Sequence, residues 1–446
     1  MLTDNVESTT CIENAERPTV WANECPDVFV VLEGKGELFM RNRWLIALSA
    51  VGIHISIGSV YAWSVLTRPI MEEMGIALKD ATWTFSLAIL FLGLSAGFLG
   101  SFVEKIGPRK SGLLSTCLFG AGMLGTALAV EQRSLPLLYL AYGVVGGMGL
   151  GIGYITPVST LVKYFPGHRG FATGLAIMGF GFAALIAGPV MQHLAANYGL
   201  ANNFIILGVV YMIIMGASSL YLKPPVDQEA RGRVTSIQRG MTANEAVRTW
   251  QFWTLWWVFF VNITCGIGLL AVASPMAQEV VGMDAMQAAS MVGIIGLLNG
   301  AGRILWSSIS DYIGRGMTYA AFFLIEIVAF YHLAGTQDVM VFQALVLLII
   351  SCYGGGFSCM PAYLSDLFGT KQLSAIHGRV LTAWGLAGIA GPMIIAIFRE
   401  NTSGYDATLY FFAACFIVNF IAAMLLKFYG KRHLERSASL AFAGKG

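Results

Sequence analysis

The sequence predicts an all-α membrane protein with twelve transmembrane helices, arranged as two pseudo-symmetric six-helix halves. Three observations predict this fold. The chain is 56% hydrophobic and only 12% charged, with a mean hydropathy of +0.69, whereas soluble domains average about 25% charged residues. Apolar stretches of about 20 residues, long enough to cross a bilayer core, recur along the whole chain. Landmarks of the first half return in the second half at a nearly constant offset.

Each apolar stretch is expected to be a helix, because a helix satisfies its own backbone polar groups inside hydrocarbon. The N-terminal half, residues 44–222, holds the stretches 44–66, 82–103, 111–130, 136–158, 170–194 and 202–222. The C-terminal half, residues 252–428, holds the stretches 252–274, 286–309, 317–335, 339–361, 379–398 and 407–428. A polar cytoplasmic linker, 223–251, is expected between the halves, with cytoplasmic tails at 1–43 and 429–446.

The N-terminal tail is mixed and acidic, without the basic start and apolar core of a secretory signal, and we expect it to be disordered. A net charge of +2 argues against a nucleic-acid partner. Seven cysteines without C-x-x-C spacing predict no disulfide framework. The sequence offers no metal-ligand spacing, nucleophile–base pair or phosphate loop. We therefore expect neither an enzyme nor a cofactor.

The distribution of Lys and Arg tests this topology. With both termini cytoplasmic, the cytoplasmic loops and linker hold thirteen basic residues, whereas the outside loops hold four: Arg68, Lys79, Arg133 and Arg399. This bias agrees with the positive-inside rule and would fail if the topology were inverted. It predicts a multi-pass protein of the cell membrane, either a plasma membrane or a bacterial inner membrane.

The two halves share landmarks. Glu104-Lys-Ile-Gly107 corresponds to Asp311-Tyr-Ile-Gly314 at an offset of 207 residues, and Gly188-Pro189 corresponds to Gly391-Pro392 at 203. Pro69 and Pro275 differ by 206, and Pro157 and Pro361 by 204. Duplicated halves predict a pseudo-two-fold transporter whose site lies near the membrane midplane between them.

The stretch Gly100-Ser-Phe-Val-Glu104-Lys105-Ile-Gly107-Pro-Arg109-Lys110 resembles the loop-2/3 signature of the major facilitator superfamily, with Glu in place of the usual Asp. An acid at a helix end beside basic residues can form an interhelical latch that breaks when the halves rock. We expect such a latch from five residues: Glu104, Lys105, Arg109, Asp311 and Arg315. The alternative is a basic loop that only sets topology.

Arg303 is the most informative single residue, because it lies inside the stretch 286–309. A cation this deep costs about 2.5–3.5 kcal/mol on insertion scales and must face protein or water. Its guanidinium suits a carboxylate, which it can bind in bidentate fashion. The flanking Gly300, Ala301 and Gly302 are expected to leave room for a ligand, and Asn299, one turn away, is neutral. A structural pair with a neighbouring acid is the alternative role.

More specifically, the chain resembles the oxalate:formate antiporter family, related to monocarboxylate transporters. The resemblance rests on Gly58-Ser-Val-Tyr61-Ala-Trp63-Ser64, Gly151-Ile-Gly-Tyr154, Lys163-Tyr-Phe-Pro166-Gly-His-Arg169-Gly170, Asn299-Gly-Ala-Gly-Arg303, Ser310-Asp311-Tyr-Ile-Gly-Arg315, Gly354-Gly-Gly-Phe357 and Ser365-Asp366-Leu-Phe-Gly369. It implies that Arg303 binds the substrate carboxylate. It also implies an aromatic cage around the substrate from Tyr61, Tyr154, Phe180, Tyr353 and Phe357.

One position departs from that family. Trp384 stands where the oxalate transporter has a second cation, a lysine. A dianion facing one arginine would leave a carboxylate largely uncompensated, so we expect a monocarboxylate such as formate, lactate or pyruvate. His54 shares a helix face with Tyr61 and is a candidate for a second positive charge or for the coupling proton. Glu326 is the other candidate for the coupling proton. A neutral histidine hydrogen-bonded within the bundle is the alternative for His54.

The sequence therefore predicts a secondary active transporter of a small organic anion, working by alternating access with proton symport or anion exchange. Its expected partners are the small carboxylate and the bilayer, and we expect a monomer. Two alternatives stay open: an exchanger of a dicarboxylate such as oxalate for formate, and a membrane sensor that binds the anion without carrying it.

Overall fold

The computed structural model describes residues 42–225, 240–402 and 404–443, and side chains as far as Tyr429. The predicted N-terminal tail, except for its last two residues, lies outside this range. All regular structure within the described residues is helical. Phe98, Ile213 and Leu48 are among many large apolar side chains that stay exposed on the helices. Such a surface is stable only in lipid, which supports the membrane assignment.

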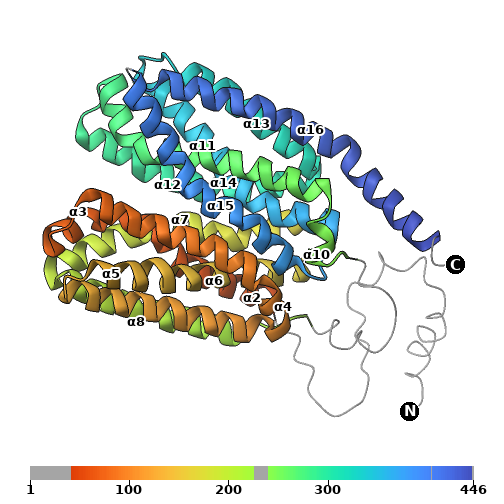
Figure 1. The fold of residues 1–446 in the computed structure, drawn as a ribbon, viewed down its shortest axis with the longest axis horizontal. Helices are drawn as coiled ribbons and strands as arrows, with labels where there is room; N and C mark the ends of the chain where they lie inside the picture. Colours follow the sequence, from red (N-terminus) through yellow and green to blue (C-terminus); the bar gives the residue numbers. More distant parts are fainter. Residues whose placement is uncertain (1–41, 226–239, 403, 444–446) are drawn as a thin grey trace, which may run out of the picture. The chain divides into compact units, whose positions relative to one another are not determined.

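The N-terminal half consists of seven α-helices, α2 to α8, with one 3₁₀ segment, η1, and one π-helical segment, η2 (Figure 1). These are α2 (Arg43–Ile57), η1 (Gly58–Ala62), α3 (Trp63–Met74), α4 (Leu78–Glu131), α5 (Leu135–Leu138), η2 (Tyr139–Gly146), α6 (Gly147–Tyr164), α7 (Arg169–Tyr198) and α8 (Leu200–Tyr221). The first crossing is tightened into 3₁₀ helix at η1, halfway through the bundle. The fourth crossing widens into π-helix at η2.

The C-terminal half forms a second bundle, green to blue in Figure 1. It contains α11 (Trp250–Val281), α12 (Ala285–Ile313), α13 (Arg315–Leu333), α14 (Val339–Phe368), α15 (Leu373–Asn401) and α16 (Asp406–Ala443). Most boundaries differ from the sequence-based ones by one or more residues, and α11 and α14 each end seven residues later than expected. Helix α15 begins six residues earlier than expected, and α16 continues beyond residue 428, where we had placed a tail.

Eleven helical segments of the described chain are long and apolar enough to cross a membrane. One of them, the 54-residue α4, holds two crossings, because its backbone leaves the helical region at Gly107 (φ 80°, ψ 166°). Gly314, the repeat partner of Gly107, has φ 85° between α12 and α13. Only glycine adopts such angles readily, so both halves turn in the same way at equivalent positions. The predicted twelve-helix fold with internal repeat is confirmed.

The predicted linker contains a short helix in its described part, α10 (Ala243–Ala246). Thr242 and Glu245 form a capping box at its start, and the hydrogen bond from the Thr242 backbone N–H lowers the pKa of the Glu245 carboxyl. The α10 segment binds the C-terminal half: the Ala243 N–H donates to Gln372 (2.8 Å), and Arg379 donates to Asn244 (2.6 Å). The end of the linker is therefore anchored beside α15.

Small residues bring helices of the two halves into close contact. A Cβ atom at Gly93 of α4 would lie 2.9 Å from the Cα of Gly385 in α15. A Cβ atom at Gly181 of α7 would lie 2.6 Å from the Cα of Gly300 in α12. The halves thus meet along two helix pairs, α4 with α15 and α7 with α12, at backbone distances that only glycine permits.

We expect Gly181→Val to reduce transport strongly and to lower the free energy of unfolding by about 1–3 kcal/mol, because the added side chain meets backbone that cannot yield locally. Thermal unfolding of the purified protein measures the second effect. Gly167→Val is the matched control, since a Cβ atom there has no neighbour within 4 Å. Equal unfolding temperatures for the two variants would contradict this view of the interface.

Candidate functional site

Arg303 of α12 is fully buried between the two halves and surrounded by aromatic side chains. Its guanidinium carbon lies 5.6 Å from the ring centre of Phe180 and 5.0 Å from that of Phe357. Five segments of the fold supply the surrounding rings. We call these residues, with the arginine, the Arg303 cage: Tyr61 (η1), Tyr154 (α6), Phe180 (α7), Tyr353 and Phe357 (α14), and Trp384 (α15).

The rings of the cage form one continuous cluster across the two halves. The Trp384 ring lies 4.7 Å from Phe357, 5.3 Å from Tyr154 and 5.5 Å from Phe180, centre to centre. The Tyr61 hydroxyl lies 3.3 Å from the Tyr353 hydroxyl. Phe180, Tyr154, Tyr353, Phe357 and Trp384 are fully buried. The structure thus brings together every aromatic residue that the resemblance had implied, around a closed site.

The hydrogen bonds of Arg303 go to neutral acceptors. Its Nε donates to Oδ1 of Asn299 (3.2 Å), and its Nη1 donates to the backbone oxygen of Ile177 (3.4 Å). Within the described residues it forms no ion pair. Asn299 therefore positions the guanidinium without neutralising it. A buried cation without a counter-charge is costly, which makes the site suited to bind an anion.

Several buried polar atoms of the cage have no hydrogen-bond partner in the described part of the chain. They are Nη2 of Arg303, the hydroxyl of Tyr154 and Nε1 of Trp384. Each unsatisfied buried group of this kind costs about 1–3 kcal/mol. All three can donate a hydrogen bond, and an ionised carboxylate only accepts them. The donor set therefore complements a carboxylate.

One expectation about the site is wrong. The glycines next to Arg303 do not leave space for a ligand, because neighbouring side chains and backbone already fill it. A Cβ atom at Gly300 would lie 2.8 Å from Cγ of Phe182, and one at Gly302 would lie 2.9 Å from the Cα of Ser351. These glycines serve helix packing, so any room for a substrate lies on the aromatic side of the guanidinium.

The two candidates for proton coupling lie in different places. His54 of α2 borders the cage, with its ring centre 5.2 Å from that of Tyr154. Glu326 of α13 lies outside the cage, where both carboxylate oxygens accept from Nδ2 of Asn262 at 3.3 Å. Glu326 is buried, and within the described part of the chain its hydrogen bonds go to Asn262 and not to Arg303 or the cage rings. His54 is therefore the better placed of the two.

His377 is a buried residue of this region that the sequence reasoning missed. It lies in the first turns of α15, and its ring centre is 5.9 Å from that of Tyr154. The expected span began at residue 379, which left His377 in a loop. Its position seven residues before Trp384, two helical turns along one face, could have revealed it.

The predicted latch residues lie at one end of the bundle, which we call the latch end. There each half supplies an acid that caps a helix of the other half. Glu104 of α4 accepts from the backbone N–H of Ser374 in α15 (2.8 Å). Asp311 of α12 accepts from the N–H groups of Gly170 (2.9 Å) and Phe171 (2.8 Å) in α7. First-turn N–H groups lack helical partners and attract negative charge.

The cations of the latch differ in part from the expected ones. Asp311 is paired with Arg315 (2.5 Å), as expected. Among the described residues, the cation that contacts Glu104 is Lys163 of α6 (3.8 Å), whereas Lys105 and Arg109, which we had included in the latch, are exposed.

Sequence reasoning missed one further acid of the latch. Asp366 of α14 binds Arg315 (3.1 Å) and Arg169 of α7 (3.0 Å), which adds a salt bridge between the halves. Asp366 and Arg169 stand in the quoted family stretches, but no spacing in the chain pairs them.

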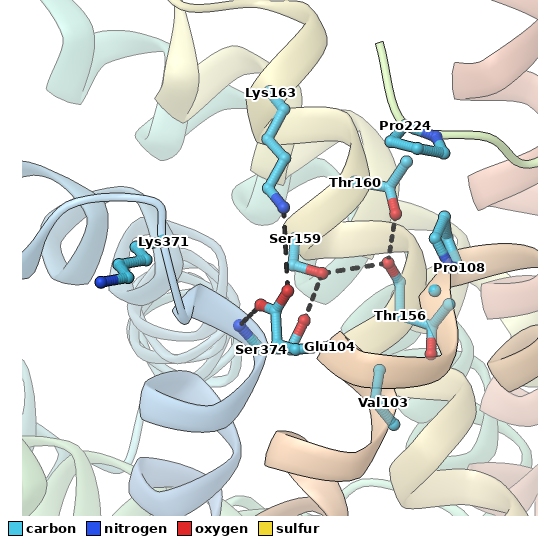
Figure 2. Close-up of a pocket in the computed structure, with 11 residues that line it drawn as sticks. Val103, Glu104, Pro108, Thr156, Ser159, Thr160, Lys163, Pro224, Lys371 and Ser374 are labelled. Atoms are coloured by element: carbon cyan, nitrogen blue, oxygen red, sulfur yellow. Dashed lines mark hydrogen bonds and ion pairs between the residues drawn. The ribbon is translucent and has the colours of Figure 1, made fainter. Parts of the chain in front are cut away.

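A polar cavity of about 250 Å³ opens beside Glu104 at the latch end (Figure 2). Figure 2 shows Lys163 and the backbone of Ser374 converging on the Glu104 carboxylate. The Ser374 hydroxyl also donates to Ser159 of α6 (2.6 Å). Hydroxyls of α6, Glu104 and the two lysines Lys163 and Lys371 make the walls hydrophilic. Water from the latch end can therefore reach the buried start of α15.

Neutralising both acids, Glu104→Gln with Asp311→Asn, is expected to open the latch end more often. Hydrogen bonds to charged groups contribute about 1.5–3 kcal/mol, so the closed state should lose at least about tenfold in population. A cysteine introduced at buried Ser159, in a background without other reactive cysteines, would then react faster with an impermeant thiol reagent. Glu131→Gln, at the other end of α4, is the control. Unchanged labelling would show that the acids only set topology.

The comparisons with known proteins agree with this architecture. A sequence model of the Major Facilitator Superfamily matches residues 46–392. The chain belongs to this superfamily. The Oxalate:formate antiporter of Oxalobacter formigenes is 29% identical over 401 residues, covering 89% of this chain and 93% of that protein. Apicoplast pyruvate carrier 1 of Toxoplasma gondii is 24% identical, covering 76% of this chain and 81% of the carrier.

A solved structure shows the same fold. The crystal structure of the major facilitator transporter FucP in the outward conformation aligns with a TM-score of 0.69 at 15% identity, covering 85% of this chain and 98% of FucP. Family membership and these relatives identify the chain as a membrane transporter and not an enzyme.

Proposed function

We propose that this transporter carries a small monocarboxylate such as formate, lactate or pyruvate, and that Arg303 binds its carboxylate at the centre of the membrane. The observation that carries the proposal is the group of unsatisfied donors around one unpaired cation: Arg303, Tyr154 and Trp384. Two carboxylate oxygens would accept from these donors and neutralise the guanidinium. The similarity to a pyruvate carrier and to an oxalate:formate antiporter supports a small carboxylate as cargo.

A single fully buried cation favours a monoanion. Among the described lysines and arginines, Arg303 alone is fully buried, and no second cation reaches the cage. A dicarboxylate would leave one carboxylate in a low-dielectric site against aromatic rings, which costs several kcal/mol. The likeness to the oxalate:formate antiporter keeps a dicarboxylate exchanger as the second candidate.

Transport is proposed to occur by alternating access. The latch end closes when Glu104 and Asp311 cap the helices of the opposite half, and it opens when those bonds break. We place the latch end at the cytoplasmic face of the cell membrane, with both termini on that side, since the basic loops gather there. A monomer suffices, because one chain supplies the whole cage.

The test is uptake of labelled formate, lactate, pyruvate and oxalate into proteoliposomes of the purified protein, with and without a pH gradient. Accumulation of at least one monocarboxylate above oxalate supports the proposal. Binding without accumulation would favour a sensor. Uptake of oxalate alone would show that one arginine accommodates a dianion.

A further inference from the structure

We propose that His377 and His54, which both lie against Tyr154, form a single proton-binding site between the two halves, which makes the transporter a proton–carboxylate symporter. The inference rests on the proposed function, because it assigns the coupling ion of the same site.

The geometry places the two imidazoles on one shared ring. The Tyr154 ring centre lies 5.2 Å from that of His54 and 5.9 Å from that of His377. His54 belongs to the N-terminal half and His377 to the C-terminal half. Each lies seven residues before a cage aromatic on its own helix, His54 before Tyr61 and His377 before Trp384. The two histidines therefore lie on the side of the cage that faces the latch end.

The hydrogen bonds of the histidines leave lone pairs free. Nδ1 of His54 lies 3.0 Å from the backbone oxygen of Ala50, and since a carbonyl only accepts, Nδ1 is the donor. In the neutral ring, Nε2 then carries the lone pair, and Nε2 has no described partner. Neither ring nitrogen of His377 has a partner among the described residues. Each ring therefore has a nitrogen that can accept a proton, once a nearby negative charge offsets the cost of a buried imidazolium.

A polar cavity lies near the site on one side. His377 lies one turn from Ser374, whose backbone N–H is bound by Glu104 and whose hydroxyl donates to Ser159. Ser374 and Ser159 line the polar cavity at the latch end (Figure 2). The cavity therefore ends one helical turn from His377, and we expect protons to reach the imidazole from this side.

Charge explains why a proton and an anion would bind together. Phe180 contacts both the Arg303 guanidinium (5.6 Å) and the His54 ring (6.4 Å), so the two groups are near neighbours. The arginine repels a second positive charge, and a bound carboxylate cancels that repulsion. Each ligand therefore promotes binding of the other to the same extent. Like charges also keep the two imidazoles from binding two protons at once.

The other titratable or charged groups around the pair do not replace it as the proton site. They are Arg303 from α12, Tyr61 from η1, Tyr154 from α6 and Tyr353 from α14, with Glu104 from α4 and Lys163 from α6 nearer the latch end. Arginine and tyrosine stay protonated near neutral pH, and Glu104 is bound to Lys163 and Ser374. Among these side chains imidazole has the unperturbed pKa nearest to neutrality, and since burial disfavours its charged form, we expect it to take up a proton only together with the carboxylate.

The stoichiometry is one proton and one carboxylate. The proton binds to an imidazole lone pair as an N–H bond, the anion binds to Arg303, and both leave on the other side of the membrane. The translocated pair is neutral. A pH gradient of one unit should therefore drive about tenfold accumulation of the anion, and a membrane potential should not drive it.

Proteoliposome uptake of formate under an imposed pH gradient tests this, with His377→Gln, His54→Gln and the exposed control His193→Gln. We expect the wild type and the control to accumulate formate about tenfold per pH unit. The two variants His377→Gln and His54→Gln should lose accumulation but retain measurable formate–formate exchange, which shows that they are folded and still bind the anion. Accumulation by both His377→Gln and His54→Gln at the wild-type level would overturn the inference and leave carboxylate transport intact.

A second measurement needs no variant. Formate added to the detergent-solubilised wild type, in weak buffer with a pH dye, should cause uptake of up to one proton per bound anion. Binding without proton uptake would overturn the inference, even if the variants do not fold. Wild-type protein that transports no monocarboxylate under any gradient would instead overturn the proposed function itself.

Discussion

Arg303→Ala is expected to reduce kcat/KM for the carboxylate by at least about 100-fold. The substrate carboxylate would lose the guanidinium that pairs with it in a fully buried site, and loss of one partner of such a pair costs about 2–5 kcal/mol. Arg303→Lys retains the charge but cannot form two parallel hydrogen bonds to the carboxylate. We therefore expect a smaller but still large reduction of kcat/KM, on the order of tenfold or more. Uptake into proteoliposomes over a range of formate concentrations measures both effects.

The stability of the same variants separates a binding role from a structural one. In the substrate-free protein Arg303 is a buried cation bound only to the neutral acceptors Asn299 and Ile177. Its removal should leave the unfolding temperature unchanged or raise it, because an uncompensated buried charge is eliminated. Arg68→Ala is the control, since Arg68 makes an exposed salt bridge with Glu72 that contributes little. Near-normal uptake by Arg303→Ala, or a large drop in its unfolding temperature, would contradict a substrate role.

The fold could be predicted because the sequence signals for it are averaged over long stretches of the chain. Twelve apolar stretches and a repeated pair of halves do not depend on the placement of a single side chain. Local irregularities were less predictable. Neither the 3₁₀ segment Gly58–Ala62 nor the π-segment Tyr139–Gly146 was predicted. The first depends on contacts that are distant in the sequence, since it packs closely against α7, where a Cβ atom at Gly58 would lie 2.6 Å from the Cα of Phe180.

The candidate site was predictable to the extent that charge in an apolar stretch is conspicuous. Arg303 is conspicuous because it is a charged residue within an apolar stretch. The aromatic residues around it were identified from the family resemblance. His377 was not recognised, because the polar residues on both sides of it led us to place the start of this helix at residue 379. The latch shows the same limit: Lys105 is adjacent to Glu104 in sequence, but the partner that contacts it is Lys163, 59 residues away.

The cage and the latch are connected by the same two helices. Within less than four turns, helix α15 carries Ser374 at the latch, then His377, and then Trp384 in the cage. Helix α6 carries Tyr154 and Ser159, which face these residues. Breaking the Glu104–Ser374 bond therefore frees the helix that holds one wall of the cage. Opening of the gate and release of the substrate can in this way be one motion.

Trp384→Lys is expected to change the preferred substrate from a monocarboxylate to a dicarboxylate. The lysine would place a second cation against Tyr154 and Phe357, where the Trp384 ring now lies. A dianion such as oxalate would then find a charge for each carboxylate, whereas a monoanion would leave one buried cation unpaired. We expect oxalate uptake to rise by about tenfold or more relative to wild type, and formate uptake to fall by a similar factor.

The matched control for this change is Trp384→Met, which removes the indole without adding charge. Both substitutions enlarge the cage and cost stability, because a large buried ring is lost. If oxalate uptake rises in the lysine variant alone, charge and not volume selects the anion. If Trp384→Met also admits oxalate, the indole excludes dicarboxylates by size, and the single charge of Arg303 does not set the specificity of this site.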